Sequence, residues 1–537
     1  MGSIVIDDVL PPTTFEVLED ACPNDTSRPA FLVSKTRGFL PRADPVVALP
    51  PAFAALESLL ARMPVQRLDG QPGLLAAGMF GDAVRAELPD LTDAVEAVAS
   101  GGGHHPQATP DLPLLNALYR DYSFVASAYL LEPCHLRFVR GEPYGLGRDV
   151  LPAAIARPMA RCAELCGFKP FMEYAGSYAL FNSRLADPAA GLAYDNLRLI
   201  RAFERGLDPA SSEAGFVLVH VAMVQHSGPL VAGTCACLDA VAAAKNAAAN
   251  TTAAATPRQA FNAGLAQVLA ALQRINGAME TMWARSRPAQ YTSFRTFIFG
   301  ITAQSMFPDG VVYEGVDEHG RVLAATASDP PAPGTTPGTR LRFRGESGAN
   351  DSMIPLMDNL LQVPMPDTPL TAILQDFRAY RPSNHRAFLA YVRARAAALG
   401  VKAFALAWAQ GDKDIVSSSS SDTIDAAVAS CRLWLQVLDQ VRDFRWRHWC
   451  FAKSYILAHT AHPTATGGSP VVTWLPNQLQ AVLAEMQAIG RAAKAAAAGT
   501  GQPRALGADV DVLLDRAERQ QATLAKEVAR YCAERGV

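Results

Sequence analysis

The sequence predicts a mainly α-helical protein that is large enough for two or more domains. The chain has 537 residues, and 50% of them are hydrophobic, so it can form a large core with room for a cofactor. Helical periodicity of the apolar residues resumes at Leu114, just after Pro113, and continues with interruptions to the C-terminus. Patterns typical of β-strands are few, so the fold class is helical rather than α/β.

Proline, glycine and alanine mark the expected boundaries between elements. The first fifty residues are rich in proline and predict irregular structure ahead of a first helix near Ala52 to Arg62. Residues 101–106 (Gly-Gly-Gly-His-His-Pro) predict an exposed loop, although its adjacent histidines are also metal-ligand types. Ala240 to Ala255 predicts an insertion between helices, residues 328–338 predict a flexible linker, and Ala492 to Gly507 predicts a mobile loop.

Charge, hydropathy and cysteine content exclude several kinds of partner. The net charge is -3, and no long basic run points to nucleic acid or an anionic membrane surface. The longest uncharged apolar stretches, such as Phe216 to Val224, are shorter than the ~20 residues that cross a bilayer. The N-terminus lacks a signal-peptide pattern, and the nine cysteines contain no Cys-x-x-Cys pair. We therefore expect a cytoplasmic protein with reduced thiols and without nucleic-acid or membrane partners.

Two short motifs resemble known active-site signatures but are incomplete. Gly145-x-Gly147 lacks the third glycine of a dinucleotide-binding loop and follows no clear strand. Residues 345–349 (Gly-Glu-Ser-Gly-Ala) lack the final glycine of a nucleophile elbow. Neither motif supports a dehydrogenase or a hydrolase.

A histidine on an apolar helical stripe is the strongest candidate for chemistry. Trp434, Val441, His448 and Tyr455 recur at seven-residue spacing and therefore share one face of a helix. Large apolar residues fill the turns between them, so the imidazole points into an apolar interior. A buried neutral imidazole is a natural haem-iron ligand. The alternative is a core histidine whose ring nitrogens are both hydrogen-bonded.

Other residues could complete a site around His448. Arg445 lies one turn earlier and could pair with a haem propionate, or it could be solvated. Asp358 lies in an otherwise apolar helix, where a carboxylate needs a partner such as the second nitrogen of a metal-bound histidine. Its alternative is a solvated helix face. Ser347 and Gly348 belong to a segment of small residues that lets the backbone approach a ligand closely.

Several segments, taken in order, resemble the indoleamine 2,3-dioxygenase family. They are residues 344–352 (Arg-Gly-Glu-Ser-Gly-Ala-Asn-Asp-Ser), residues 380–389 (Tyr-Arg-Pro-Ser-Asn-His-Arg-Ala-Phe-Leu), Arg445-x-x-His448 with Lys453-x-Tyr455, and residues 466–470 (Thr-Gly-Gly-Ser-Pro). The similarity extends upstream through residues 309–315 (Asp-Gly-Val-Val-Tyr-Glu-Gly) and covers most of the chain. Each motif is modest alone, but their order and spacing together are specific.

The resemblance implies a haem protein with two helical domains. We place the smaller N-terminal domain at residues 1–200 and the larger all-helical domain at residues 201–537, with haem b between them. His448 matches the proximal iron ligand of the family. Arg445 matches the arginine that pairs with a haem propionate, and Asp358 matches the carboxylate that supports the proximal histidine. A second family histidine, His385, is expected to be structural.

The resemblance also implies a substrate pocket on the distal side of the haem. Arg295 aligns with the arginine that holds the carboxylate of tryptophan, a role that suits a guanidinium fork. Tyr291 takes the place of one of the two aromatic residues that precede this arginine. Gln290 takes the place of the other, so one apolar wall is lost or supplied from elsewhere. Three further positions align with pocket residues: Tyr174, Ser177 and Phe216.

His220 departs from the animal members of the family, which have serine at this position. The related tryptophan 2,3-dioxygenases use a distal histidine that accepts a hydrogen bond from the indole N–H. His220 lies four residues after Phe216 and hence on the same helical face. We expect a distal role for it, and the alternative is a hydrogen bond to bound oxygen.

The implied reaction is the opening of the indole ring of L-tryptophan by O2 to give N-formylkynurenine, the first step of the kynurenine pathway. It requires ferrous haem and therefore an electron donor. Two alternatives stay open: a haem oxygenase that acts on another indole, which Gln290 favours, and a non-catalytic oxygen-binding haem protein.

Overall fold

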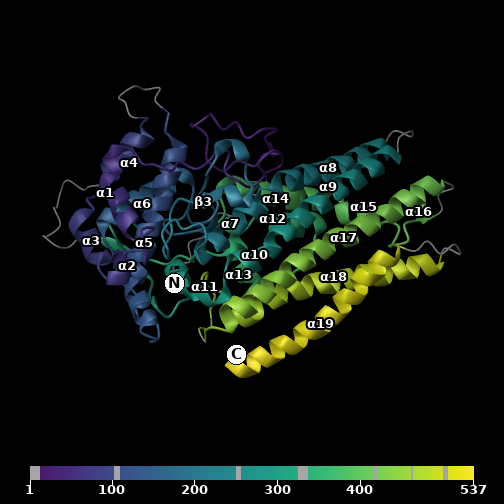
Figure 1. Ribbon diagram of the computed structural model, residues 1–537. Coiled ribbons are helices and arrows are strands. Elements are labelled where there is room, and N and C mark those ends of the chain that lie inside the picture. Colours follow the sequence, from purple (N-terminus) through teal and green to yellow (C-terminus); the bar gives the residue numbers. More distant parts are fainter. Residues whose placement is uncertain are drawn as a thin grey trace.

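The computed structural model describes residues 12–101, 109–248, 255–323, 337–416, 420–460, 462, 464–499 and 506–536. Helices dominate this part of the chain (Figure 1), which confirms the predicted fold class. Residues 12–50 contain no helix, and the predicted first helix is present as a short 3-10 turn followed by α1.

The N-terminal third of the chain consists of short helices around one long helix, α5. The helices are α1 (Ala54–Arg62), α2 (Leu74–Ala77), α3 (Phe80–Glu87), α4 (Thr92–Ala99), α5 (Leu112–Val139) and α6 (Ala153–Cys166), with short turns η1 (Pro51–Phe53), η2 (Tyr174–Tyr178), η3 (Pro188–Ala190) and η4 (Tyr194–Asn196). The side chain of Asp111 accepts a hydrogen bond from the backbone N–H of Leu114 at 3.0 Å, and this N-cap explains why α5 begins where it does.

The remaining chain forms a bundle of long helices. Its elements are α7 (Ser212–Val224), α8 (Ser227–Ala248), α9 (Ala255–Glu280), α10 (Met282–Arg285), α11 (Pro288–Arg295), η5 (Thr296–Ile298), η6 (Gly348–Asn350), α12 (Met353–Leu361), α13 (Pro369–Arg378), α14 (Ser383–Leu399), α15 (Val401–Leu406), α16 (Lys413–Val416), α17 (Ser421–Phe451), η7 (Ala452–Leu457), α18 (Val471–Gly499) and α19 (Ala508–Arg535). In Figure 1 the long helices α8, α9, α17, α18 and α19 run side by side, away from α1 to α6.

Short strands connect the two groups of helices. Strand β1 (Val150–Leu151) pairs in parallel with β4 (Val311–Glu314), and β4 pairs antiparallel with β5 (Gly338–Leu341). Strands β2 (Ser183–Leu185) and β3 (Leu197–Leu199) form an antiparallel pair. One hydrophobic core continues from the N-terminal segment to α19. The proposed domain boundary at residue 200 stays a prediction.

Two predicted boundaries are wrong. Helix α8 continues to Ala248 and α18 continues to Gly499, so much of the predicted insertion at Ala240 and of the predicted loop at Ala492 is helical. Alanine has the highest helix propensity of all residues, and the alanine-rich composition that was interpreted as flexible favours helix extension. The predicted His104–His105 loop and nearly all of the predicted linker at residues 328–338 lie outside the described residues.

One helical stretch is long and apolar enough to cross a membrane by length and composition. It is Ser212–Asn246, with a mean hydropathy of 1.4 and 56% of its most apolar window buried. The stretch consists of α7 and α8, separated by a turn at Gln225 and His226. Buried core helices pass the same test, so the finding is weak evidence for a membrane span.

A buried ionic network stabilises the N-terminal helices. Asp121 accepts hydrogen bonds from Arg120 Nε at 2.7 Å and from Arg201 Nη2 at 2.8 Å. Arg201 also donates from Nη1 to Glu57 at 2.8 Å. Burial raises the pKa of Asp121, but the two guanidiniums outweigh this effect and hold the pKa below its usual value. The carboxylate therefore joins α5 to the segment that follows β3.

Asp121→Ala should destabilise the protein strongly, because it leaves two buried guanidiniums without their shared counter-charge. We expect the free energy of unfolding to fall by about 3–5 kcal/mol, measured by urea denaturation with circular dichroism. Asp149→Ala is the matched control, since Asp149 pairs with Arg340 at the exposed surface and should cost no more than ~1 kcal/mol. Equal losses in the two variants would contradict the prediction.

Candidate functional site

His448 borders the main cavity of the protein. It lies in the last turn of α17, directly before the π-helical turn η7. The three other members of its predicted stripe, Trp434, Val441 and Tyr455, are buried, as expected from the seven-residue spacing. The cavity has a volume of ≈ 1080 Å³ when it is counted out to its open mouth.

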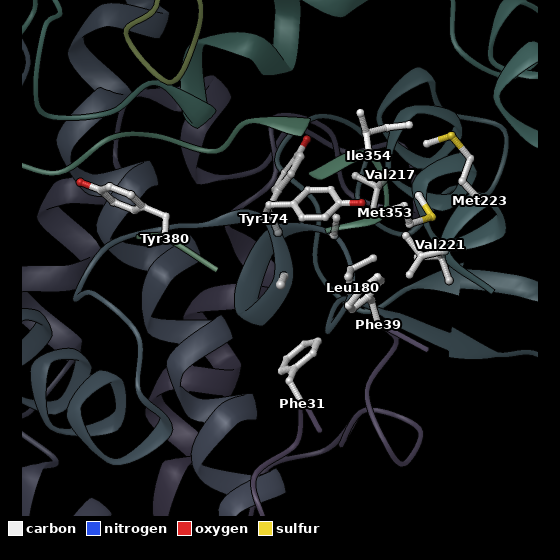
Figure 2. Packing of buried hydrophobic residues seen from close by; sticks show 14 of the residues in the cluster. Phe31, Phe39, Tyr174, Leu180, Val217, Val221, Met223, Met353, Ile354 and Tyr380 are labelled. Carbon is white, nitrogen blue, oxygen red and sulfur yellow. The ribbon is translucent and has the colours of Figure 1, made fainter. Parts of the chain in front are cut away.

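The cavity is lined by residues from seven separate segments of the chain, and most of them are apolar or aromatic. They are Tyr174, Phe216, His220, Met223, Met279, Met282, Tyr291, Glu346, Ser347, Gly348, Asp351, Met353, Phe444, His448, Phe451, Ala452, Tyr455, Ile456, Ala465, Thr466, Ser469, Pro470, Val471, Trp474 and Leu475. Figure 2 shows the packing of three of these side chains, Tyr174, Met223 and Met353, against neighbouring core residues. The structure thus brings seven of the predicted site residues to the walls of the same cavity.

His448 is neutral at physiological pH. Burial, together with smaller electrostatic contributions from His220 and Arg445, lowers the pKa of its imidazole to about 4. Among the described residues, neither ring nitrogen has a hydrogen-bond partner. A neutral imidazole with unused nitrogens is the form that binds a metal ion.

His220 is held in one tautomer by its own helix. Its Nδ1 lies 2.8 Å from the carbonyl oxygen of Phe216, and because a carbonyl can only accept, Nδ1 carries the proton. Burial lowers the pKa of His220, so Nε2 is left as an acceptor. A Cβ atom at Gly348 would lie 3.3 Å from Nε2, and the absence of a side chain there leaves space beside the acceptor.

Aromatic residues surround this acceptor. The rings of Phe216 and Tyr174 lie 4.9 Å and 5.6 Å from the ring of His220, both edge-on. Tyr291 lies 5.3 Å from Phe216. The hydroxyl of Tyr174 is buried without a hydrogen-bond partner in the described part of the chain. The predicted distal residues Phe216, His220, Tyr174 and Tyr291 therefore form one contiguous group.

Asp358 does not contact His448 and pairs with Arg445 instead. Both carboxylate oxygens accept from Arg445 Nη2, at 2.9 Å and 2.8 Å. The predicted bond from Asp358 to the histidine is therefore corrected: the buried guanidinium one turn away is the stronger partner. Arg445 Nη1 has no partner among the described residues, so it remains available to a second anion.

Arg295 and Ser177 are not part of the cavity wall. Arg295 is 0% exposed; it donates to the carbonyl oxygen of Thr464 at 2.9 Å and lies over the ring of Phe299. Its Nε and Nη1 lack partners among the residues described. The hydroxyl of Ser177 donates to the carbonyl of Glu173 at 2.7 Å and accepts from the N–H of the same residue at 2.8 Å. The hydroxyl of Ser177 thus closes the η2 turn, and its predicted pocket role stays a prediction.

Gln290 is turned away from the cavity. Its side-chain oxygen accepts a hydrogen bond from Ser212 Oγ at 2.6 Å. The aromatic wall that the resemblance implies at this position is absent, and methionines from α9 and α10 line the cavity instead, at Met279 and Met282.

Comparison with known proteins identifies the family. The sequence profile of the family described as Indoleamine 2,3-dioxygenase matches residues 27–506. The chain belongs to the indoleamine 2,3-dioxygenase family. The resemblance stated from the sequence is thereby confirmed, and with it a dioxygenase class of oxidoreductase.

Relatives in animals and fungi are distant. Indoleamine 2,3-dioxygenase 1 of Mus musculus is 24% identical over 356 residues, which cover 65% of this chain and 70% of the relative. Indoleamine 2,3-dioxygenase of Saccharomyces cerevisiae is 26% identical over 296 residues, covering 52% of this chain and 55% of the relative. Indoleamine 2,3-dioxygenase nanC of Aspergillus nanangensis is 23% identical over 453 residues, covering 83% and 90%. The family assignment rests on the profile match over residues 27–506, and these relatives are consistent with it.

The indoleamine 2,3-dioxygenase family is haem-dependent, and the residues of this cavity fit such a group. His448 offers an unprotonated nitrogen, and the lining is mainly apolar. Arg445 lies one turn from His448, outside the cavity lining, and its buried Nη1 has no partner among the described residues, as required for a propionate. Ser347 and Gly348, which sequence analysis assigned to the cofactor, lie in the cavity wall.

Glu346 is a residue of the cavity that was not predicted from the sequence. Its side chain lines the cavity and is 2% exposed. Burial, together with a smaller contribution from the nearby charge of Glu173, raises the pKa of the carboxyl to about 8. The signal in the sequence was an acidic residue enclosed by small residues, at Gly345-Glu346-Ser347-Gly348.

Glu346→Gln should change how thermal stability depends on pH. In the folded state the Glu346 carboxyl keeps its proton up to about pH 8. In the unfolded chain it loses the proton near pH 4.5, the ordinary pKa of a glutamate. This contribution to wild-type stability is fully present below pH 4.5 and is lost as pH rises to about 8. We therefore expect the melting temperature of the variant, relative to wild type, to increase between pH 5 and pH 8. A difference that does not change with pH, measured by differential scanning fluorimetry, would refute the assignment.

Proposed function

We propose that this protein is a haem-dependent dioxygenase that opens the indole ring of L-tryptophan with O2 to give N-formylkynurenine. The observation that carries the proposal is a single apolar cavity bordered by two neutral histidines. His448 has unused ring nitrogens, and His220 presents an acceptor nitrogen among aromatic side chains. The family supports the reaction class.

Four residues would hold the haem in this proposal. His448 would bind the iron, Arg445 would pair with a propionate through its free Nη1, and Ser347 and Gly348 would leave space for the haem beside the backbone. The haem, kept ferrous by an electron donor, supplies the binding of O2 and its reactivity toward the C2=C3 bond of the indole. The Arg445–Asp358 ion pair would fix the arginine, which lies one turn from the ligand.

The chain's own residues would orient the indole and exclude water. His220 Nε2 would accept the hydrogen bond of the indole N–H, since its Nδ1 proton is committed to the Phe216 carbonyl. Phe216, Tyr174 and Tyr291 would pack against the ring. Arg295 would bind the carboxylate of tryptophan through its two unpartnered nitrogens, which requires the guanidinium to reach past Tyr291 from outside the wall. Orientation in a dry cavity accounts for the protein's share of the catalysis.

A second candidate is the oxidation of a different indole. Two observations favour it: Gln290 replaces an aromatic wall and faces Ser212, and Arg295 lies outside the cavity lining. A non-catalytic oxygen-binding protein has no comparable support, because such a protein has no use for a buried arginine with free donors.

Turnover with isotopically labelled oxygen tests the proposal directly. Protein loaded with haem b, a chemical reductant and 18O2 should convert L-tryptophan to a product heavier by two labelled oxygen atoms, measured by mass spectrometry. His448→Ala should lose both the haem absorbance and the product, because the axial ligand is gone, while the exposed His319→Ala should retain both. Absence of product from the wild-type protein, or of a second labelled atom in it, would reject the assignment.

Arg295→Ala should weaken tryptophan binding without altering the haem spectrum. Removing one partner of a buried charge pair costs about 2 kcal/mol or more, which corresponds to a rise of ~30-fold in the dissociation constant. Isothermal titration calorimetry measures the change. Arg342→Ala is the control, since Arg342 is exposed and its ion-pair partner Asp309 is 3.8 Å away. Unchanged binding in Arg295→Ala would remove the arginine from the substrate site.

A further inference from the structure

Glu346 differs from the other buried glutamates in having no partner. The carboxylate of Glu173 accepts from the backbone N–H groups of Ala175 and Gly176. Glu213 accepts from the N–H groups of Phe203 and Glu204. In the described part of the chain, the carboxylate of Glu346 has neither a hydrogen bond nor an ion pair.

An unpartnered carboxylate in an apolar cavity is costly unless a ligand satisfies it. Glu346 is 2% exposed, and its side chain lines the cavity. Burial is the main cause of the raised pKa of this carboxyl. An adjacent cation would therefore stabilise its ionised form. A group with these properties in a cleft is a candidate for ligand binding.

The charges that face the cavity favour a cationic ligand. Among the described residues, no arginine or lysine belongs to the lining. The second acidic residue there, Asp351, is already occupied: it accepts from the backbone N–H groups of Met353 and Ile354 at 3.0 Å and 3.1 Å and so caps α12. Glu346 is therefore the acidic group of the lining that is free for a ligand.

One segment, which contains Thr464 and Thr466, contacts both Glu346 and Arg295. Both residues lie near the aromatic side chains of the cavity. Thr466 Oγ1 donates to the carbonyl oxygen of Glu346 at 2.8 Å, and Arg295 donates to the carbonyl of Thr464 in the same segment. The charges of both residues act on the hydroxyl of Tyr291, in opposite directions. Glu346 and Arg295 are therefore both close enough to Tyr291 for their charges to act on its hydroxyl.

We propose that Glu346 is the residue that binds the ammonium group of the substrate. This inference rests on the proposed indole oxidation and names a residue that binds its substrate. An ammonium group offers three donors, and a desolvated carboxylate binds them through charge-assisted hydrogen bonds. Glu346 would act inside the cavity, whereas Arg295 would reach the carboxylate from outside it.

Three ligands separate the contribution of each charged group. L-tryptophan carries an ammonium and a carboxylate, tryptamine carries the ammonium alone, and indole-3-propionate carries the carboxylate alone. Dissociation constants are measured by calorimetry on the haem-loaded protein. In Glu346→Gln, binding of L-tryptophan and tryptamine should weaken at least ~10-fold, and binding of indole-3-propionate should stay within about twofold.

Two further variants guard against an indirect effect. Asp376→Asn removes a negative charge that pairs with Arg344, two residues from Glu346, outside the cavity lining; it should leave all three ligands unaffected. Glu346→Asp keeps the charge and should retain the preference for tryptamine over indole-3-propionate. Haem absorbance and melting temperature establish that each variant is folded.

The outcomes distinguish this inference from the proposed function. Equal weakening of all three ligands in Glu346→Gln, or weakening of none, overturns the role of Glu346 even if the wild-type protein oxidises tryptophan. Amine binding that depends on Glu346, in a protein that incorporates no oxygen, supports the inference and rejects the proposed reaction.

Discussion

The cost of removing ionisable groups from water controls the arrangement of this cavity. Every such group around it is neutral, paired or left for a ligand. Burial keeps the imidazoles of His220 and His448 neutral. Arg445 and Asp358 form an ion pair. Glu346 is the exception among the lining residues. The cavity therefore combines low polarity with a few groups in defined states, which is the usual composition of a small-molecule site.

Long helices and one π-turn position these groups. Helix α17 packs on α9 and α18 and carries His448 to the cavity at its C-terminal end. The turn η7 then redirects the chain so that the hydroxyl of Tyr455 donates to the carbonyl oxygen of Ser286 at 2.5 Å. That bond joins the end of α17 to the segment that leads into α11, where Tyr291 and Arg295 lie. The same tyrosine ring also contacts Tyr291, with 5.7 Å between ring centroids, so Tyr455 helps to fix the two sides of the site relative to each other.

Periodicity and family motifs predicted the helical fold and the placement of His448, because apolar spacing determines which helical face is buried. The hydrogen-bond partners of the polar side chains could not be predicted from this spacing. Asp358 pairs with Arg445 and the Ser177 hydroxyl closes its own turn, since both outcomes depend on distances between segments far apart in sequence. Glu346 was missed for the same reason: its lack of a partner is a property of the three-dimensional surroundings. Alanine-rich segments were misjudged because helix propensity and apparent low complexity coincide there.

The fixed tautomer of His220 determines where the proton of this imidazole lies. Its one proton is committed to a backbone carbonyl, and His448 carries no second proton to exchange. His220 can therefore release its proton only by breaking the bond to the Phe216 carbonyl. The proposed addition of both atoms of O2 to tryptophan to form N-formylkynurenine consumes no proton and releases none. A cavity histidine that keeps its proton suits a reaction with that stoichiometry.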